Sequence, residues 1–447
     1  MFSIANAELP VLPLFESAFT TAATFVRVKL LGVAAILTTG RRTVRNLLRT
    51  VAGLTEGDPS SYHRVLSLAQ WSGLSLAALL TRFVFRHFWP QGRVRLVGDD
   101  TVTEHPGPKV HGKARHRDPV RSSHSYTAWR WGHKWVVLAI LVHLPFARRP
   151  WALPVLVALY RSPQDNQKRG RPHRTPAQLQ QLLLRLLLRW FPDRQFLFAG
   201  DQNYGSHEMA RLAPRSHGRL HVVSKFSPKA RLYEPAPPYA GHGRPRVKGA
   251  KLPTPQEVVA QAPRTRLKVA WYGGGQRAVE VVSGTGHWYK AGQGLVPVRW
   301  VYVHDVTGTH RDEYFYSTDV ELTPQEIIEA YTGRWNIETT FEEARAYLGL
   351  ESTRGWCERT VGRAEPCLLG LYSVVALMYW LLPPADQDQG VVEWEGKETV
   401  TFSDAISAVR RWLWTHWVFP QAGHAQTFAK LPQAFRQLLL DALAPAA

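Results

Sequence analysis

The sequence has very few cysteines and no long uninterrupted apolar run. Its 447 residues contain two cysteines, Cys357 and Cys367, which excludes a disulfide scaffold and a four-cysteine zinc site. The longest apolar run, residues 366–382, is short for a membrane span and typical of a buried helix. The N-terminus has no basic segment followed by an apolar core and a cleavage site. We therefore expect a cytoplasmic protein with no membrane partner.

Acidic residues are scarce relative to basic ones. The chain carries 35 Asp and Glu against 55 Lys and Arg, a formal net charge of +20 and a pI near 10.2. Such a balance favours an extended polyanion as the partner, because counterions are released along a phosphate backbone. Binding to ribosomes or to a membrane surface are the alternative explanations. With 45% hydrophobic residues, a chain of this length holds a large core and two or three domains.

The most informative stretch begins at Thr323. Thr323, Pro324 and Glu326 form a capping-box pattern, which predicts one helix running to about Leu348. At about 100° per residue, one narrow face of this helix carries a tyrosine, a carboxylate and two guanidiniums, on Tyr331, Arg334, Glu338 and Arg345. An apolar stripe beside it is suited to docking on a sheet. An ordinary amphipathic helix with intrahelical ion pairs is the alternative.

The spacing Tyr331-(2)-Arg334-(3)-Glu338-(6)-Arg345 resembles a known signature. It is similar to the Tyr-(2)-Arg-(3)-Glu-(6)-Lys motif of one branch of bacterial insertion-sequence transposases with a DDE catalytic triad. Arg345 departs from the motif's lysine, and guanidinium and ammonium differ in geometry. The resemblance implies that Tyr331, Arg334 and Arg345 hold the phosphates that flank the scissile bond.

The segments before this helix follow the order of a ribonuclease H-like fold. A strand at residues 93–97 ends in two acids, and strands at 134–144 and 153–160 follow. A helix at 176–190 then leads to a strand at 195–199, and another strand covers residues 220–226. We predict an α/β protein in which catalytic carboxylates gather at strand tips and on the later helix.

The resemblance implies three catalytic and metal-binding acids: Asp99, Asp201 and Glu338. Asp99-Asp100-Thr101 fits the family's Asp-x-Thr, which favours Asp99 as the first acid and leaves Asp100 as the alternative. Tyr204 fits the family's Asp-x-x-Tyr and belongs to the same site. Hard divalent ions prefer such oxygen ligands, so we expect two Mg²⁺ or Mn²⁺ ions that activate the nucleophile and stabilise the leaving oxygen. Four histidines between residues 105 and 124 are spaced too irregularly to indicate a metal site.

We predict five regions along the chain. They are a helical N-terminal DNA-binding region (1–90), a first part of the ribonuclease H-like core (91–226), a β-rich insertion (227–322), a second part of the core with the glutamate helix and the following helix (323–382), and a helical C-terminal region (383–447). The transposase branch has an insertion at the same place.

Two further groups of residues are candidate DNA contacts. Arg41, Arg42 and Arg45 lie on a basic segment of a helix-turn-helix-like unit. Transposases of this family flip a base near the transposon end and stack it on an aromatic residue of the insertion, which makes Trp300 and Tyr314 candidates. Structural roles in strands are the alternative for both.

These observations predict a DNA transposase that cleaves the ends of an insertion sequence and joins them to target DNA. The resemblance implies double-stranded DNA as the partner, a homodimer in a synaptic complex, and a place at the bacterial nucleoid. Two other readings stay open. One is a domesticated, non-catalytic DNA-binding protein on the same fold, and the other is a ribonuclease H-like nuclease without strand transfer.

Overall fold

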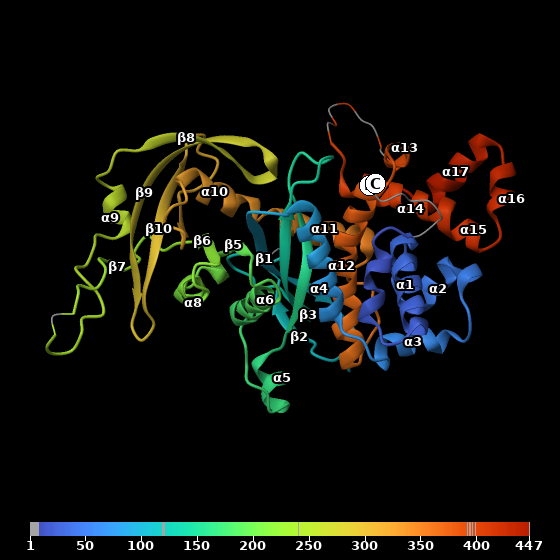
Figure 1. Ribbon diagram of the computed structural model, residues 1–447, viewed down its shortest axis with the longest axis horizontal. Helices are drawn as coiled ribbons and strands as arrows, with labels where there is room; N and C mark the ends of the chain where they lie inside the picture. The colour runs from blue at the N-terminus through green and yellow to red at the C-terminus, as the bar shows by residue number, and fades with distance from the viewer. Residues whose placement is uncertain are drawn as a thin grey trace.

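One long mixed sheet runs through the protein, with helices on its faces and a helical body at one end (Figure 1). The computed structural model describes residues 9–118, 121–239, 241–390, 392, 395, 397 and 399–446. The strands of the insertion lie at the left of Figure 1, and the N-terminal and C-terminal helices lie together at the right.

The central part of the sheet has the ribonuclease H-like arrangement. Its strands lie in the order β4-β3-β1-β5-β6, where β3 is antiparallel to β1 and β4, and β5 and β6 are parallel to β1. The bounds are β1 (Arg93–Glu104), β3 (Trp129–Val142), β4 (Trp151–Tyr160), β5 (Gln195–Gly200) and β6 (Leu220–Lys225). The short helix α5 (Pro163–Lys168) follows β4, and α6 (Pro176–Trp190) packs its apolar face on β3 and β4 before the chain enters β5. The predicted fold class and strand order are confirmed.

β1 is longer than predicted. The strand continues to Glu104, so Asp99 and Asp100 lie within it rather than at its end. The longer β3 provides the reason, because it pairs with β1 as far as Glu104 opposite Gly132. The parallel neighbour β5 ends level with Gly98. Asp99 and Asp100 therefore lie just beyond the point where β1 stops pairing with β5.

The basic stretch after β1 contains a strand that the sequence did not indicate. β2 (Ala114–Arg117) pairs antiparallel with the first residues of β3. Together they form an arm at the edge of the sheet.

The β-rich insertion continues the core sheet. Its elements are β7 (Leu232–Tyr233), α9 (Pro255–Val259), β8 (Thr265–Ala270), β9 (Gln276–Lys290), β10 (Gly294–Asp305) and β11 (Glu313–Ser317). β11 pairs antiparallel with β6, with Tyr316 opposite Ser224, so one ladder of backbone hydrogen bonds crosses the boundary. The helices α7 (His207–Ala210) and α8 (Leu212–Arg215) precede β6.

The predicted single helix from Thr323 to Leu348 is wrong in one respect, because it is two helices. α10 (Pro324–Gly333) and α11 (Asn336–Leu348) meet at Arg334 and Trp335. The amides of these two residues donate to carbonyls three residues back, at 3.2 Å each, which tightens the turn after Gly333. The predicted capping box at Thr323 is present. α11 ends at Gly349, which has the left-handed conformation favoured by glycine (φ 63°).

Helices form both ends of the described chain. The N-terminal ones are η1 (Leu12–Ala18), α1 (Ala22–Leu37), α2 (Val44–Thr50), η2 (Ala52–Leu54), α3 (Pro59–Ser67) and α4 (Gly73–Phe88). The C-terminal ones are α13 (Pro384–Gln387), η5 (Asp388–Gly390), α14 (Phe402–Leu413), η6 (Trp414–Val418), α15 (Phe419–Gln421), α16 (Ala425–Lys430) and α17 (Gln433–Leu443). Most of α14 is buried against α12, α1 and α17, so the two ends of the chain form one helical body.

α12 (Glu358–Leu381) is the central helix of the core. It begins before the apolar run seen in the sequence and packs against β4, α11 and α14. Among the described residues it alone is long and apolar enough to cross a membrane, and 67% of its apolar window is buried inside the protein. That burial is the behaviour of a core helix.

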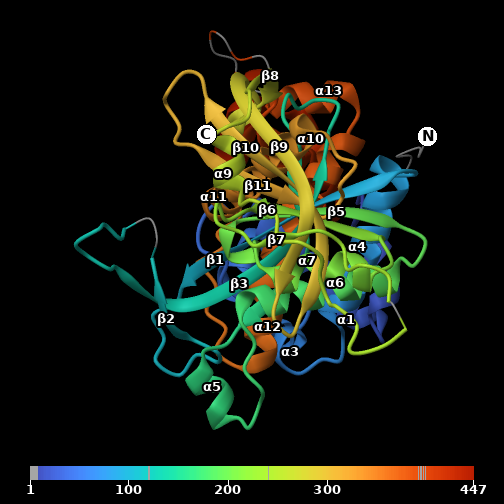
Figure 2. The ribbon, with the colours of Figure 1, turned by 90° about the vertical axis from the view of Figure 1, so that its left-hand side faces the viewer.

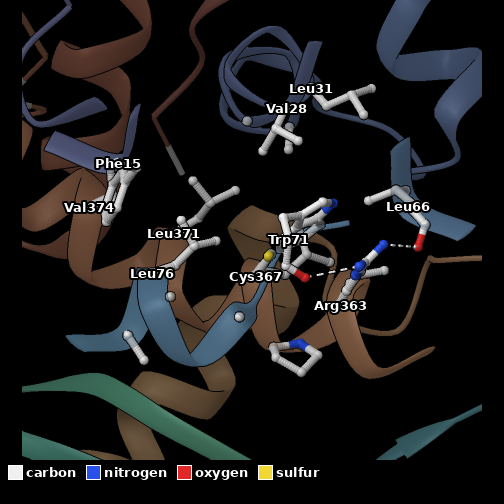
Figure 3. A pocket seen from close by; sticks show the side chains of 18 of the residues that line it. Phe15, Val28, Leu31, Leu66, Trp71, Leu76, Arg363, Cys367, Leu371 and Val374 are labelled. Carbon is white, nitrogen blue, oxygen red and sulfur yellow. Dashed lines mark hydrogen bonds between the residues drawn. The ribbon is translucent and has the colours of Figure 1, made fainter. Parts of the chain in front are cut away.

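A cavity of about 410 Å³ lies between α12 and the N-terminal helices that pack on it (Figure 3). Arg363 borders it and donates to the carbonyls of Leu66 and Trp71 at 3.0 and 2.9 Å. The thiol of Cys367 also borders it, and burial raises the pKa of that thiol to about 11. The rest of its wall is mostly apolar. Asp99, Asp201 and Glu338 are not among the residues that line it.

Candidate active site

Asp99 and Glu338 are joined by one guanidinium. Arg334 lies at the junction of α10 and α11, where its Nη1 is 2.6 Å from the Asp99 carboxylate. Its Nη2 is 2.9 Å from Glu338 Oε1, one turn further along the chain. The Arg334 side chain is 9% exposed, whereas that of Glu338 is 42% exposed. The tight turn after Gly333 thus leaves Arg334 buried between the sheet and a carboxylate that solvent reaches.

Asp201 lies at the tip of β5, close to this group. Its carboxylate accepts hydrogen bonds from the Asn203 amide at 2.9 Å and from Asn203 Nδ2 at 3.0 Å. Ser224 on β6 donates to the Asp201 carbonyl at 2.7 Å. These bonds fix the loop that carries Asp201, and the charges of Asp99 and Arg334 reach its surroundings.

Tyr204 completes the floor of the site. Its side chain is fully buried, and its hydroxyl has no hydrogen-bond partner among the described residues. Burial raises the pKa of this hydroxyl well above its usual value, and the negative charges of Asp100, Asp99 and Asp201 raise it further. The hydroxyl is therefore a neutral group held next to the acids.

The two candidate first acids lie on opposite faces of β1, because side chains alternate along a strand. Asp99 faces Arg334, and Thr101, two residues on, receives a bond from Arg345 of α11. Asp100 instead pairs with Lys134 of β3 at 2.8 Å. This geometry favours Asp99 as the acid that shares a site with Glu338.

Arg334 alone does not offset the cost of burying the negative charges of Asp99 and Asp201. Burial raises the pKa of Asp99 to about 7, although Arg334 acts to lower it, and Asp201 and Asp100 raise it further. Burial also raises the pKa of Asp201, again against the effect of Arg334. For Arg334 itself, burial lowers the pKa, but the carboxylates of Asp99 and Glu338 outweigh this effect and raise it. The site is short of positive charge.

The donor chemistry fits a divalent metal ion. Carboxylate oxygens with a deficit of positive charge are what hard ions such as Mg²⁺ bind. As the side chains stand, no three His, Cys, Asp or Glu residues in the described part of the chain are close enough to hold one ion. Arg334 lies between two of the acids in this arrangement.

Tyr331 and Arg345 have structural contacts on the same helices. Tyr331 is buried and stacks on Phe315 of β11, with ring centroids 4.3 Å apart. Arg345 Nε donates to Glu351 at 3.0 Å, and its Nη2 donates to Thr101 and to the Val102 carbonyl at 3.2 Å. Arg345 therefore ties α11 to β1.

Of the predicted stacking aromatics of the insertion, one is buried and the other is half-buried. Trp300 is 2% exposed, and its indole fills the space above Gly284 on the neighbouring strand. It lies on the face of β10 that also carries the buried Val296 and Val298. Tyr314 is half-buried against Tyr302, and the charges around it are those of Asp312 and Arg264 rather than of the acids.

Different aromatic residues line a hollow of about 470 Å³ near the acids. Tyr272 and His310 stack there with centroids 6.1 Å apart and ring planes at 14°, and Trp335 lies on the wall. The charges of Arg334 and Glu338 act on Tyr272, which places this hollow close to them. One feature of the sequence could have indicated Tyr272. It directly precedes three glycines, 273–275, and aromatic rings on such glycine-rich turns are often accessible.

The predicted arginine cluster just before and within α2 separates into surface and core residues. Arg41 and Arg45 are exposed. Arg42 is 6% exposed and donates to the carbonyls of Gly40 at 2.7 Å and of Tyr347 at the end of α11. A DNA contact by Arg42 does not fit this arrangement, because the guanidinium is used to cap α11.

Two family models match the sequence. The model described as DDE superfamily endonuclease matches residues 14–278, and the one described as archaeal putative transposase ISC1217 matches residues 274–363. Together they cover Asp99, Asp201 and Glu338. A comparison with curated proteins gives no match.

Among solved structures, the cryo-EM structure of a piggyBac transposase synaptic complex with hairpin DNA is similar at 10% sequence identity and a TM-score of 0.42. The match covers 99% of this chain and 86% of that chain. A likeness at that level carries no argument of its own. The first family model spans more than half of the chain, and the protein belongs to the DDE superfamily of endonucleases.

Proposed function

We propose that this protein is a DNA transposase of an insertion sequence. In this proposal it cleaves the ends of its element and joins them to target DNA by two-metal phosphoryl transfer. The observation that carries the proposal is the convergence of Asp99 and Glu338 on Arg334, with Asp201 beside them. Membership of the superfamily implies a divalent metal. The assignment to the bacterial branch rests on the tyrosine-arginine-glutamate spacing.

Asp99, Asp201 and Glu338 are the residues that would hold Mg²⁺ or Mn²⁺. When bound, the ions activate the attacking oxygen and stabilise the leaving oxygen. The chain's own groups then position the DNA. Arg334 and Arg345 offer guanidiniums to phosphates, and the neutral Tyr204 hydroxyl offers a donor beside the acids.

The aromatic hollow beside the acids supports a role in holding an unpaired base. Tyr272, His310 and Trp335 line it, and base-aromatic stacking tolerates any base. We assign to them the role that the sequence assigned to Trp300 and Tyr314.

The regions outside the core supply DNA contacts and assembly in this proposal. Region 1–90 binds element ends through exposed residues such as Arg41 and Arg45, region 227–322 holds the base, and region 383–447 closes the helical body. A homodimer on double-stranded DNA at the nucleoid of the cytoplasm follows from the need to hold two ends together.

The test is metal-dependent cleavage of the element's own terminal DNA by wild type and by Glu338→Ala. We expect the variant to bind the ends and to cleave them about a hundredfold more slowly or worse, the scale of losing one group that stabilises a transition state. Glu342→Ala is the matched control, because Glu342 is an exposed carboxylate one turn further along α11.

Each other result has a definite meaning. Equal cleavage by wild type and Glu338→Ala removes Glu338 from the mechanism. Tight binding of ends without cleavage by wild type favours the domesticated DNA-binding protein, and cleavage without joining favours the nuclease.

A further inference from the structure

One face of the arm formed by β2 and the start of β3 exposes two large aromatic rings. Trp129 and Trp131 are 50% and 56% exposed. They lie two residues apart on β3, so they stand on the same face. Figure 2 shows β2 and the beginning of β3 standing away from the body at the left of the view.

Cations alternate with these rings. Arg115 is paired across the strands with Trp131, and its guanidinium lies 4.8 Å from the ring centroid of the diagonal Trp129. The Lys113 ammonium lies 5.5 Å from the ring centroid of Trp131. Lys113, Trp131, Arg115 and Trp129 therefore form a cation-tryptophan ladder along the exposed face.

The opposite face of the arm fastens it to the core. Arg130 points away from the ladder and pairs with Asp118 at 2.9 Å and with Glu351 at 3.7 Å. Glu351 also accepts from Arg345 of α11 at 3.0 Å. Ion pairs thus connect the arm to the helix that carries Glu338, and the ladder residues are not needed for this anchoring.

The spacing of the two rings suits a base. Residues two apart on a strand are roughly 6.8 Å apart, about twice the 3.4 Å stacking distance of nucleic acids. One base plane therefore fits between two parallel indoles once the Arg115 guanidinium, which lies over Trp129, moves aside. The neighbouring ammonium and guanidinium lie where they can reach the phosphates of the same strand.

The charge of the arm decides the class of partner. Between residues 105 and 131 the sequence contains one carboxylate, Asp118, and its side chain is 5% exposed and paired with Arg130. The exposed face thus combines aromatic rings with cations alone, the combination that single-stranded nucleic acid recognises. A protein partner would have to match the rings and the positive charge together.

We propose that the cation-tryptophan ladder binds unpaired bases of DNA by stacking them on Trp129 and Trp131. The proposal rests on the function proposed above and adds a second place where that DNA is held. Asp99 is opposite Val137 on β3, and Trp131 lies six residues earlier, roughly 20 Å away along the strand. A single strand of DNA that is unpaired near the acids can span that distance to the ladder.

The test measures binding without cleavage, in EDTA, by fluorescence anisotropy of a labelled single-stranded oligonucleotide and of its duplex. We expect Trp129→Ala and Trp131→Ala each to weaken single-strand binding by about tenfold or more, and duplex binding by less than about threefold. Trp129→Phe should retain most of the affinity, because a phenyl ring still stacks. The control is Tyr239→Ala, which removes another exposed aromatic ring.

Thermal melting of each variant checks that the arm still folds. Unchanged single-strand affinity in folded Trp129→Ala and Trp131→Ala overturns the proposal. Loss of self-association by sedimentation, with DNA binding intact, also overturns it and assigns the ladder to a protein contact. If wild type cleaves element ends while the ladder variants bind single strands normally, only this inference falls. Absence of all DNA binding by wild type overturns the proposed function as well.

Discussion

At the scale of single residues, the candidate site depends on the position of Arg334. A buried guanidinium needs carboxylates, and a mostly buried carboxylate such as that of Asp99 needs a cation. Asp99, Glu338 and Arg334 meet both needs within 2.9 Å. The pKa of Asp99 stays at about 7 because burial outweighs Arg334. One arginine is therefore too little positive charge for these acids, which is the electrostatic condition of a cation-binding site.

Arg345 differs from the motif's lysine, and its contacts predict the effect of restoring it. Arg345→Lys retains the charge but cannot bond Glu351, Thr101 and the Val102 carbonyl together. We expect a loss of about 1 kcal/mol in stability, the scale of one hydrogen bond, and cleavage within about tenfold of wild type. Thermal melting and the end-cleavage assay measure the two effects.

Arg345→Ala provides the comparison, since it removes both charge and bonds and should lose more on both measures. An Arg345→Lys protein that melts like wild type would show that the hydrogen bonds from Arg345 to β1 and Glu351 do not contribute to stability.

At the scale of elements, the arm holds a buried histidine, His116, on the face opposite the ladder. Burial lowers the pKa of His116 to about 4, Lys134 lowers it further and Asp100 raises it. His133 also lowers it, and a hydrogen bond with the Gly132 backbone raises it. The folded arm thus holds this imidazole neutral.

The lowered pKa of His116 predicts acid sensitivity of the metal-free protein. Between pH 6.5 and 4 the unfolded chain binds a proton that the folded chain does not, so stability falls as the pH falls and levels off below about 4. At 1.36 kcal/mol per pKa unit, the loss by pH 5 is about 2 kcal/mol. His116→Gln should reduce the drop in melting temperature between pH 7 and 5.

Other histidines with lowered pKa values, His105 and His111, act in the same direction, so the variant reduces the acid sensitivity without removing it. His124→Gln is the matched control because this side chain is exposed. Identical pH dependence in wild type and His116→Gln would contradict the assignment.

At the scale of the whole molecule, charge sets the strength of DNA binding. The net charge is +20, and exposed arginines occur on the N-terminal helices as well as on the arm. A protein that neutralises 6–10 phosphates loses about 10³–10⁵ in affinity between 50 and 200 mM salt. We expect a loss of this order for duplex DNA, measured as the slope of log affinity against log salt.

Substitutions divide this effect into its parts. Arg41→Ala with Arg45→Ala should lower the salt slope by about two, because each removes one phosphate contact. Arg42→Ala, whose side chain is buried, should leave the slope unchanged and lower stability instead. If the salt slope is the same in wild type and in the Arg41→Ala, Arg45→Ala variant, the N-terminal region is not part of the DNA interface.

The strands and helices of the core could be predicted from the sequence because the alternation of polar and apolar side chains depends only on neighbouring residues. The helix at residues 176–190 has the predicted bounds. The β1 ending was missed because its length depends on pairing with β3. The break at Arg334 was missed because Gly333 alone does not tell whether a helix bends there.

The sequence by itself determined the fold class, the order of the strands and the acids worth examining, since side-chain periodicity and motif spacing are properties of neighbouring residues. Only the tertiary structure decided which acid faces Arg334, that Trp300 and Arg42 are buried, and that Trp129 and Trp131 share an exposed face with Lys113 and Arg115. Burial and pairing depend on residues far apart in the chain, such as Asp99 and Arg334, whose contact exists only once the sheet and α11 have packed together.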